Sequence, residues 1–264
     1  MSPARGSVPT TRFPAQAHAN HPVPSAAATP PDPEAVKIDS AASPFVLIAA
    51  IPAALAFALG PVWLGVVLLV LPLAILLFFR DPERTPPDDA TLILSPADGR
   101  VMYAGDGKTE EAPAGTWLQV TIFLSLFDVH INRTPAAGRV TRVEYIPGSF
   151  KAAFKPEARE NERSEIWIDH HGIPIVVRQV VGVLARRVVC RVKPGDVVAP
   201  GARIGLMKFG SRMDVFVPRS ATLTVKAGDT VTAGETIVAR LAPGSLDGAE
   251  GRQATPGNVE TTDR

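Results

Sequence analysis

Hydrophobic and polar positions divide the chain into four stretches. From Ser40 to Phe79 no residue is charged and almost every position is apolar, with one break at Gly60-Pro61. From Thr91 to Leu241 apolar residues recur with a period near two, and Gly, Pro and Asp separate the runs, which predicts β-strands. The remaining stretches are rich in small and polar residues. We therefore predict a disordered tail over 1–40, a helical hairpin over 41–80, a β-rich domain over 81–242 and a second disordered tail over 243–264.

The uncharged stretch predicts two helices, Pro44–Leu59 and Val62–Phe79, that are long enough to enter a bilayer. They would measure roughly 24 and 27 Å, slightly less than a hydrocarbon core of about 30 Å, so two short spans or a hairpin inserted from one side both fit. Basic residues flank the stretch and its tip carries no charge, which places both ends on the cytoplasmic face. The alternative is a buried hairpin of a soluble protein.

Two segments of the β-rich domain form a degenerate repeat. "VKPGDVVAPGARI" (Val192–Ile204) and "VKAGDTVTAGETI" (Val225–Ile237) share Gly-Asp turns and returning valines at equal positions. The pattern resembles that of biotinyl and lipoyl carrier domains and predicts a mainly β fold with a β-sandwich or barrel-sandwich-like core. A membrane-tethered carrier with a modified Lys208 is therefore an alternative function. Against it, Lys208 runs directly into an apolar strand rather than an exposed turn.

The net charge and the composition of the chain bear on which partners, bonds and metals to expect. The formal net charge of +1 does not suggest a nucleic-acid partner. With one cysteine, Cys190, no intramolecular disulfide can form, and we interpret this residue as a small buried hydrophobe. The sequence contains no cluster of metal-ligand residues, so we expect no metal.

The stretch "LMKFGSRMDVFVP" (Leu206–Pro218) raises the central question of the sequence, because a Gly-Ser pair interrupts a strand pattern. After Gly210-Ser211, apolar and other residues alternate directly, so the strand continues. A glycine in such a pattern usually marks a β-bulge or a close backbone approach. Either Gly210 forms a bulge, or the Gly210-Ser211 bond itself takes part in chemistry.

One histidine and one aspartate are candidates to act with Ser211. His130 lies in an apolar run, where an imidazole needs a partner, and it is either a satisfied core histidine or a general base. Asp98, in an Asp-Gly turn, could orient that histidine and stabilise its cation, with Asp128 as a competitor. We expect the other histidines to be solvated, His18 and His21 in the tail and His170 and His171 in a turn.

Several motifs together make the sequence resemble the phosphatidylserine decarboxylases of the short bacterial type. They are "SPADG" (Ser95–Gly99), "FDVHINR" (Phe127–Arg133), "PGSFKAAF", "NERSEIWI", "GVLARR" (Gly182–Arg187) and "KFGSR" (Lys208–Arg212). The resemblance covers about residues 81 to 241 and the hairpin before them. One departure from the family's larger form is Phe-Gly-Ser-Arg in place of its Leu-Gly-Ser-Thr cleavage motif.

The resemblance implies that the chain makes its own cofactor. His130, oriented by Asp98, would deprotonate Ser211, which attacks the Gly210 carbonyl and cuts the chain by serinolysis. Ser211 would become a pyruvoyl group, whose ketone takes up the electrons left when phosphatidylserine loses carbon dioxide. The products are a large chain, 1–210, paired with a small chain, 211–264, at the cytoplasmic face of the cell membrane.

The resemblance leaves some points open. Another serine-headed lipid is an alternative substrate, and the oligomeric state, a homo-oligomer included, is undetermined. We expect basic residues near the site to attract anionic lipid or to form a solvated face; they are Arg133, Arg186, Arg187 and Arg212. We also expect self-cleavage to need only the β-rich domain, with the hairpin acting as a tether.

Overall fold

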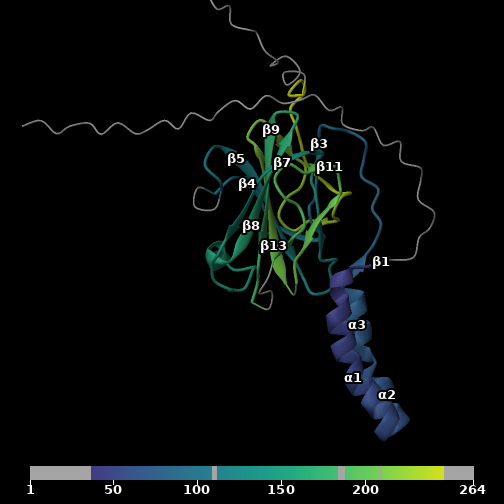
Figure 1. Ribbon diagram of the computed structural model, residues 1–264. Helices are drawn as coiled ribbons and strands as arrows, with labels where there is room; N and C mark the ends of the chain where they lie inside the picture. The colour runs from purple at the N-terminus through teal and green to yellow at the C-terminus, as the bar shows by residue number, and fades with distance from the viewer. Residues whose placement is uncertain (1–36, 109–111, 184–187, 209, 247–264) are drawn as a thin grey trace, which may run out of the picture. The chain divides into compact units, whose positions relative to one another are not determined.

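A computed structural model describes residues 37–108, 112–183, 188–208 and 210–246. Most of both predicted tails, together with Arg186 and Arg187, lies outside these described residues. The described chain is mainly β, with a helical region before the strands, as predicted (Figure 1).

The helical region forms the predicted hairpin. A short 3-10 helix, η1 (Ser40–Ala42), leads into α1 (Ser43–Leu59), and the return limb divides at Leu69 into α2 (Val62–Leu68) and α3 (Val70–Phe78). Figure 1 shows α1 running alongside the other two. The helices pack through small residues, because Ala49, Ala53 and Ala56 are buried and a Cβ at Gly65 would lie 2.6 Å from the Phe57 ring.

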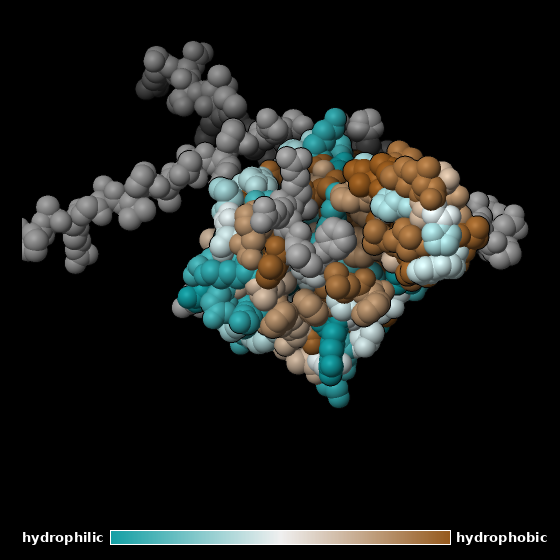
Figure 2. Space-filling view, turned by 90° about the horizontal axis from the view of Figure 1, so that it is seen from below, coloured by the Kyte–Doolittle hydropathy of each residue, from teal (hydrophilic) through white to brown (hydrophobic). Residues whose placement is uncertain are grey.

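Large apolar side chains cover the outside of the hairpin. Leu47, Ile48, Leu59, Val62 and Trp63 are all more than half exposed, and Figure 2 shows this surface in brown. The helical stretch Ser40–Leu59 is long and apolar enough to cross a membrane, whereas Val62–Phe78 is shorter. This exposure argues against a buried hairpin of a soluble protein, because a soluble helix would bury its large apolar side chains.

The two ends of the hairpin are joined where it meets the β-rich domain. Strand β1 (Lys37–Ile38) pairs with β2 (Arg80–Asp81) in antiparallel register. The buried Asp39 caps η1 and accepts two hydrogen bonds from Arg191, at 2.6 and 2.7 Å. We call residues 37–42 and 78–81 the foot of the hairpin.

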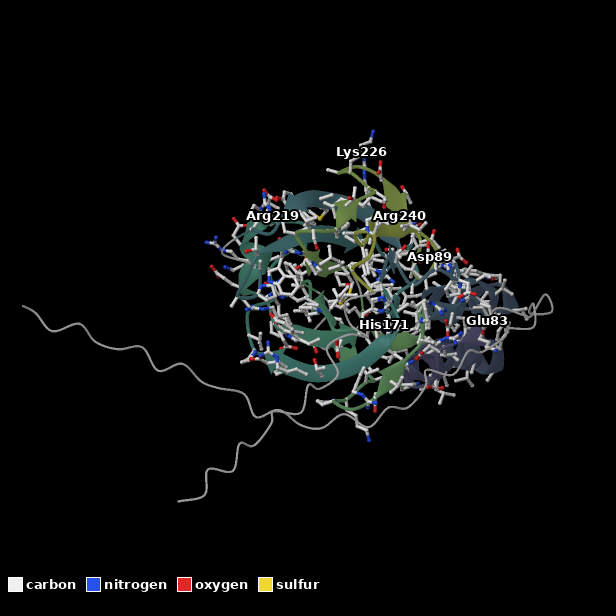
Figure 3. All side chains as sticks on the ribbon, turned by 90° about the horizontal axis from the view of Figure 1, so that it is seen from above. Glu83, Asp89, His171, Arg219, Lys226 and Arg240 are labelled. Atoms are coloured by element: carbon white, nitrogen blue, oxygen red, sulfur yellow. The ribbon has the colours of Figure 1, made fainter. Side chains whose placement is uncertain are left out.

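The main sheet has eight antiparallel strands in the order β11-β7-β8-β9-β13-β5-β4-β15. Figure 3 shows its strands curving round an interior filled with side chains. Six of these strands have eight or nine residues, in stretches where apolar residues recur with a period near two. The bounds are β4 (Gly99–Asp106), β5 (Trp117–Leu124), β7 (Gly138–Ile146), β8 (Arg163–His170), β9 (Ile173–Val180), β11 (Val197–Val198), β13 (Ser211–Pro218) and β15 (Thr230–Val231).

Two three-stranded sheets complete the domain. One has the order β10-β12-β6 and the other β14-β16-β3, with the 3-10 helix η2 (Pro156–Glu160) in a loop. Buried Ile93, Ile204 and Val238 from these small sheets join Val120 and Val215 of the main sheet in one core. The bounds are β3 (Leu92–Leu94), β6 (Ile131–Arg133), β10 (Val189–Cys190), β12 (Arg203–Leu206), β14 (Thr222–Leu223) and β16 (Ile237–Arg240).

The predicted sequence repeat is also a structural repeat. Gly195 and Gly228 both have positive φ, 97° and 99°, and their amides donate to Val140 and Val101 respectively, each at 2.8 Å. The strands that follow, β11 and β15, occupy the two edges of the main sheet. The two halves therefore make the same turn against equivalent strands, while the likeness to biotinyl carriers stays a prediction.

The β-rich domain contains a second repeat. "SPADGRV" (Ser95–Val101) matches "TPAAGRV" (Thr134–Val140), and both segments enter a main-sheet strand through a glycine of large positive φ. The amide of Leu94 donates to Pro135, and the amide of Arg133 donates to Pro96. The two turns thus lie side by side, and they differ chiefly at Asp98, which Ala137 replaces in the second copy.

Candidate active site

Ser211 is the first residue of β13 and lies inside the main sheet, between β5 and β9. Its side chain is fully buried, and its Oγ has no hydrogen-bond partner in the described part of the chain. The pairing with β5 runs from Ser211↔Leu124 to Pro218↔Trp117 without a register shift. The ladder is therefore regular from the serine onward, and Gly210 precedes this strand rather than interrupting it.

Two glycines shape the backbone at the Gly210-Ser211 bond for different reasons. Gly210 has φ of +73°, a conformation that favours glycine, although a Cβ there would have nothing within 4 Å. At Gly182 the limit is space rather than backbone conformation, because a Cβ on it would lie 1.9 Å from the Gly210 carbonyl oxygen. The absence of a side chain at Gly182 thus leaves room for that carbonyl at the end of the sheet.

His130 immediately precedes β6 and is fully buried. Its Nδ1 lies 2.8 Å from the backbone oxygen of Asp128, while its Nε2 is buried with no partner among the described residues. A carbonyl oxygen only accepts, so Nδ1 carries the proton and Nε2 presents a lone pair. Burial lowers the pKa of His130 from 6.5 to about 4, so the ring is neutral at neutral pH.

Asp98 is held by groups other than the imidazole in this structure. Its Oδ2 accepts from Arg84 Nη2 and its Oδ1 from the amide of Ala233, both at 2.7 Å. Burial raises the pKa of this carboxyl, and the nearby charge of Asp128 raises it further. The carboxylate of Asp128 accepts from the amide and hydroxyl of Ser125, so its backbone carbonyl, not its side chain, holds His130.

The main sheet places two of the predicted site residues, Asp98 and Ser211, at one end of β5. In register, Arg100 of β4 and Arg212 of β13 both pair with Phe123, so Asp98 and Ser211 lie on either side of the end of β5. The loop that leaves β5 leads directly to His130. Three adjacent strands span roughly 10 Å, so the sheet brings Asp98 and Ser211 into one neighbourhood, and that His130 acts there stays a prediction.

The internal repeat bears on Asp98. Ala137 occupies the equivalent turn of the second copy, and that turn forms with no carboxylate. An aspartate is therefore not needed to build the turn, which weakens the purely structural interpretation of Asp98. Its role in orienting His130 stays a prediction.

An apolar pocket opens beside the Gly210-Ser211 bond. Its volume is about 370 Å³, and Gly210 is part of its wall. Phe127 of this wall is 85% exposed, and Phe123 and Phe154 meet edge to face with ring centroids 5.8 Å apart. Aromatic and small apolar residues make up almost the whole lining, which is formed by Phe123, Ser125, Leu126, Phe127, Ala152, Ala153, Phe154, Val183 and Gly210.

Several expectations about neighbouring residues are corrected. Arg133 is 4% exposed and donates to Asp81 and to two backbone oxygens, and Arg212 is 5% exposed and paired with Asp214. Neither forms a basic surface for lipid. His170 is buried, with both ring nitrogens against backbone oxygens, whereas His171 is exposed (Figure 3).

Two buried amides near the site were missed by sequence reasoning. Gln179 Nε2 donates to Asn132 Oδ1 at 2.8 Å, which leaves Gln179 Oε1 and Asn132 Nδ2 unpaired among the described residues. Asn132 lies in β6 two residues after His130, and Gln179 pairs with Met213, two residues after Ser211. The "HIN" spacing could have pointed to Asn132, because alternate residues of a strand share one face.

The described residues contain no group of three or more His, Cys, Asp or Glu side chains placed to hold a metal ion. Lys208, the residue of the carrier alternative, places its Nζ 4.7 Å from the ring centroid of Phe45 on α1. This position against a helix differs from the exposed turn that a carrier lysine needs.

Comparison with known proteins identifies related sequences. A family model described as phosphatidylserine decarboxylase matches residues 71–239. A phosphatidylserine decarboxylase proenzyme of Chlorobium chlorochromatii is 45% identical over 185 residues, 69% of this chain and 86% of the relative. Proenzymes of the same name from Symbiobacterium thermophilum and Geotalea uraniireducens are 46% and 40% identical, covering 67% and 75% of this chain and 84% and 93% of those relatives.

Proposed function

The chain belongs to the phosphatidylserine decarboxylase family, and we propose that it converts phosphatidylserine to phosphatidylethanolamine with a pyruvoyl group made from its own Ser211. The observation that carries this proposal is the buried Ser211 hydroxyl, unpaired among the described residues and placed directly after a glycine of positive φ. The carrier alternative is not favoured, because the family is one of enzymes and Lys208 packs over a helix.

In the first step, His130 is the general base. Its Nδ1–H is bound to the Asp128 carbonyl, so Nε2 is the nitrogen that can accept the Ser211 proton. The Ser211 oxygen then attacks the Gly210 carbonyl carbon, and the peptide bond is replaced by an ester as the nitrogen becomes an amine. Asp98, at the same end of the sheet, would stabilise the imidazolium that forms.

Elimination completes the cleavage. Loss of the ester's carboxylate leaves Gly210 with a free carboxyl end and residue 211 as a dehydroalanine. Addition of water with release of ammonia converts that residue to a pyruvoyl group. In decarboxylation, this group would accept the electron pair that remains on the substrate when carbon dioxide leaves.

The surroundings fit a pyruvoyl group and a lipid substrate. The end of β13 is shielded from bulk water, and the pocket beside Gly210 is apolar enough for the part of a phospholipid below its headgroup. Exposed Phe127 and the apolar hairpin support action at a membrane surface, and the flanking basic residues favour the cytoplasmic face.

Intact-mass spectrometry of the wild type and of Ser211→Ala tests the proposal. The wild type should give a chain ending at Gly210 and a small chain lighter, by one ammonia, than residues 211–264 beginning with serine. Ser211→Ala should give one full-length chain without decarboxylase activity. A fully active protein that remains one chain would overturn the proposal.

The two chains should stay associated after cleavage. β13 lies between β5 and β9 of the large chain, and β15 and β16 pair with β4 and β3. The small chain therefore supplies strands to the main sheet and to one of the two small sheets, and it should separate only in denaturant.

A further inference from the structure

We propose that Phe78, the last residue of α3, is a positioning residue for His130, so that the foot of the membrane hairpin forms one wall of the catalytic site. This inference rests on the proposed function and adds to it a residue outside the β-rich domain. It also revises the expectation that self-cleavage needs only that domain.

The ring of Phe78 lies on the imidazole. The two ring centroids are 4.1 Å apart with an angle of 35° between the planes. The hydrogen bond from Nδ1 to Asp128 fixes one edge of the imidazole, and the Phe78 ring limits its tilt. Phe78 is 9% exposed and belongs to a small apolar cluster with Phe79, Val129, Ile131 and Leu206, which is separate from the main core.

The position of Phe78 is set by bonds on both sides of it. Arg80 donates to the backbone oxygen of Leu77 at 2.9 Å and to that of Phe127 at 2.6 Å, which ties the end of α3 to the loop before His130. The amide of Asp39 donates to the Phe79 oxygen at 2.9 Å. The foot therefore holds Phe78 against His130 whatever the position of the rest of the hairpin.

The packing of Phe78 on the imidazole also affects the pKa of His130. Burial is the main cause of the low pKa of His130, and Phe78 supplies part of that burial. The charged groups that act on the ring are Asp128 on its own loop, which raises the pKa of His130, and Arg80 on the foot, which lowers it. With Phe78 in place, the imidazole stays neutral well below neutral pH; without it, water reaches the ring and its pKa rises toward 6.5.

The pH profile of self-cleavage tests this role. Full-length proenzyme would be made by pulsed cell-free synthesis into lipid nanodiscs, and cleavage would be followed after a shift to pH 5.5 or 7.5. Wild-type protein should cleave at nearly the same rate at both values. Phe78→Ala should cleave up to about tenfold more slowly at pH 5.5 than at 7.5, because an imidazole of ordinary pKa is about one-tenth neutral at the lower value.

Leu77→Ala is the matched control, because it removes an exposed apolar side chain from the neighbouring position of the same helix. Its profile should be as flat as that of the wild type. Phe78→Leu keeps apolar volume but loses the ring, and should show a smaller decrease of at least about twofold, in the same direction. A flat profile for both Phe78 variants would overturn the inference.

Acylation by diethyl pyrocarbonate provides a second readout in the uncleavable Ser211→Ala background. His130 should be protected with Phe78 present and should react in Phe78→Ala at least about tenfold faster, since burial limits its access. Buried His170 reports whether the fold is intact, and exposed His171 gives the unprotected rate. If His170 also reacts in Phe78→Ala, Phe78→Leu decides the question, and unchanged protection of His130 overturns the inference.

The two proposals fail in different ways. Cleavage that persists in Ser211→Ala would overturn the proposed function. Cleavage that needs Ser211 but has the same pH profile in every Phe78 variant would overturn the positioning role alone.

Discussion

His130 Nε2 and Ser211 Oγ are two buried polar atoms that make no hydrogen bond within the described residues. A buried polar atom without a partner costs about 1–3 kcal/mol, so a folded chain retains such atoms chiefly where function requires them. One of these atoms belongs to a hydroxyl donor and the other is a ring nitrogen with a free lone pair; Ser211 begins β13 of the main sheet, and His130 precedes β6 of a small sheet. Each can supply what the other lacks, which is the first step of serinolysis.

Asp98 gives the sharpest prediction at the scale of single residues. Asp98→Asn should slow self-cleavage by roughly 10²-fold or more, because it removes the carboxylate predicted to orient His130 and to stabilise its cation. The measurement is the appearance of the chain ending at Gly210 over time in nanodiscs. Asp128→Asn is the comparison, because its carboxylate holds Ser125 while its backbone carbonyl holds His130.

The outcome for Asp98 separates two roles. If Asp98→Asn matures at the wild-type rate while Asp128→Asn is slow, the orienting role belongs to the Ser125–Asp128 turn. If both mature normally, neither carboxylate assists His130 in cleavage.

Sequence reasoning reached these residues but not their contacts. An imidazole in an apolar run must find a partner, so His130 could be singled out from its neighbours alone. Which atom becomes that partner depends on the loop between β5 and β6, where a backbone carbonyl turned toward the ring. No residue type signals a backbone acceptor, and therefore the contact with Asp128 could not be predicted.

Among the secondary-structure elements, the turn before β13 depends on space left by Gly182. Gly182→Ala should reduce self-cleavage by at least about tenfold, because its Cβ would lie 1.9 Å from the Gly210 oxygen and the reacting carbonyl would have to move. The rate of chain cleavage measures this effect. Gly105→Ala is the control, since its Cβ would meet only the flexible end of Tyr103; equal loss in both variants would point to general destabilisation.

The foot of the hairpin depends on one buried carboxylate. Arg191 binds Asp39 through two hydrogen bonds and holds the pKa of Asp39 below its usual value, so Arg191→Ala leaves a buried charge unpaired. We expect a loss of about 3–5 kcal/mol in the free energy of unfolding of the Ser211→Ala proenzyme, measured by denaturant titration in detergent. Arg219→Ala, which breaks an exposed pair with Asp106, should cost less than about 1 kcal/mol.

Elements were predictable where periodicity was strong. The hairpin, the long strands and the repeat all followed from the spacing of apolar residues and from Gly-Asp turns. The division of the return limb at Leu69 and the shortness of β10 were not predicted, because no Gly or Pro marks either boundary. The match between Ser95–Val101 and Thr134–Val140 was present in the sequence, but its meaning needed the paired turns to be seen.

At the scale of the whole molecule, long-range pairing explains how one cut can leave the protein intact. Ser211 begins a strand whose partners on both sides lie in the large chain, so breaking the bond before it leaves the pairing of β13 from Arg212 onward in place. The same pairing could not be foreseen from sequence, because strand order in an antiparallel sheet is set by contacts far apart in the chain. Apolar periodicity predicts that strands exist but not which strands are neighbours.

The pocket, the foot and the hairpin together predict how the molecule meets its substrate. Arg80 links the end of α3 to the backbone of Phe127, so an exposed apolar loop of the pocket lies next to the foot of the apolar hairpin. A bilayer that receives the hairpin would then also meet Phe127. An amphiphilic substrate could pass from the lipid surface into the pocket beside Gly210 without crossing water.

Phe127→Ser should therefore lower activity on phosphatidylserine in bilayers by about tenfold, the loss expected when one large apolar side chain no longer enters lipid. Activity on a dispersed short-chain analogue should change less than about twofold, because the catalytic residues are untouched. Val197→Ser is the control: it is also exposed, but it lies on β11, which pairs with the opposite end of β7 from Ile146. Equal losses on both substrates would mean that Phe127 shapes the pocket itself rather than its contact with the membrane.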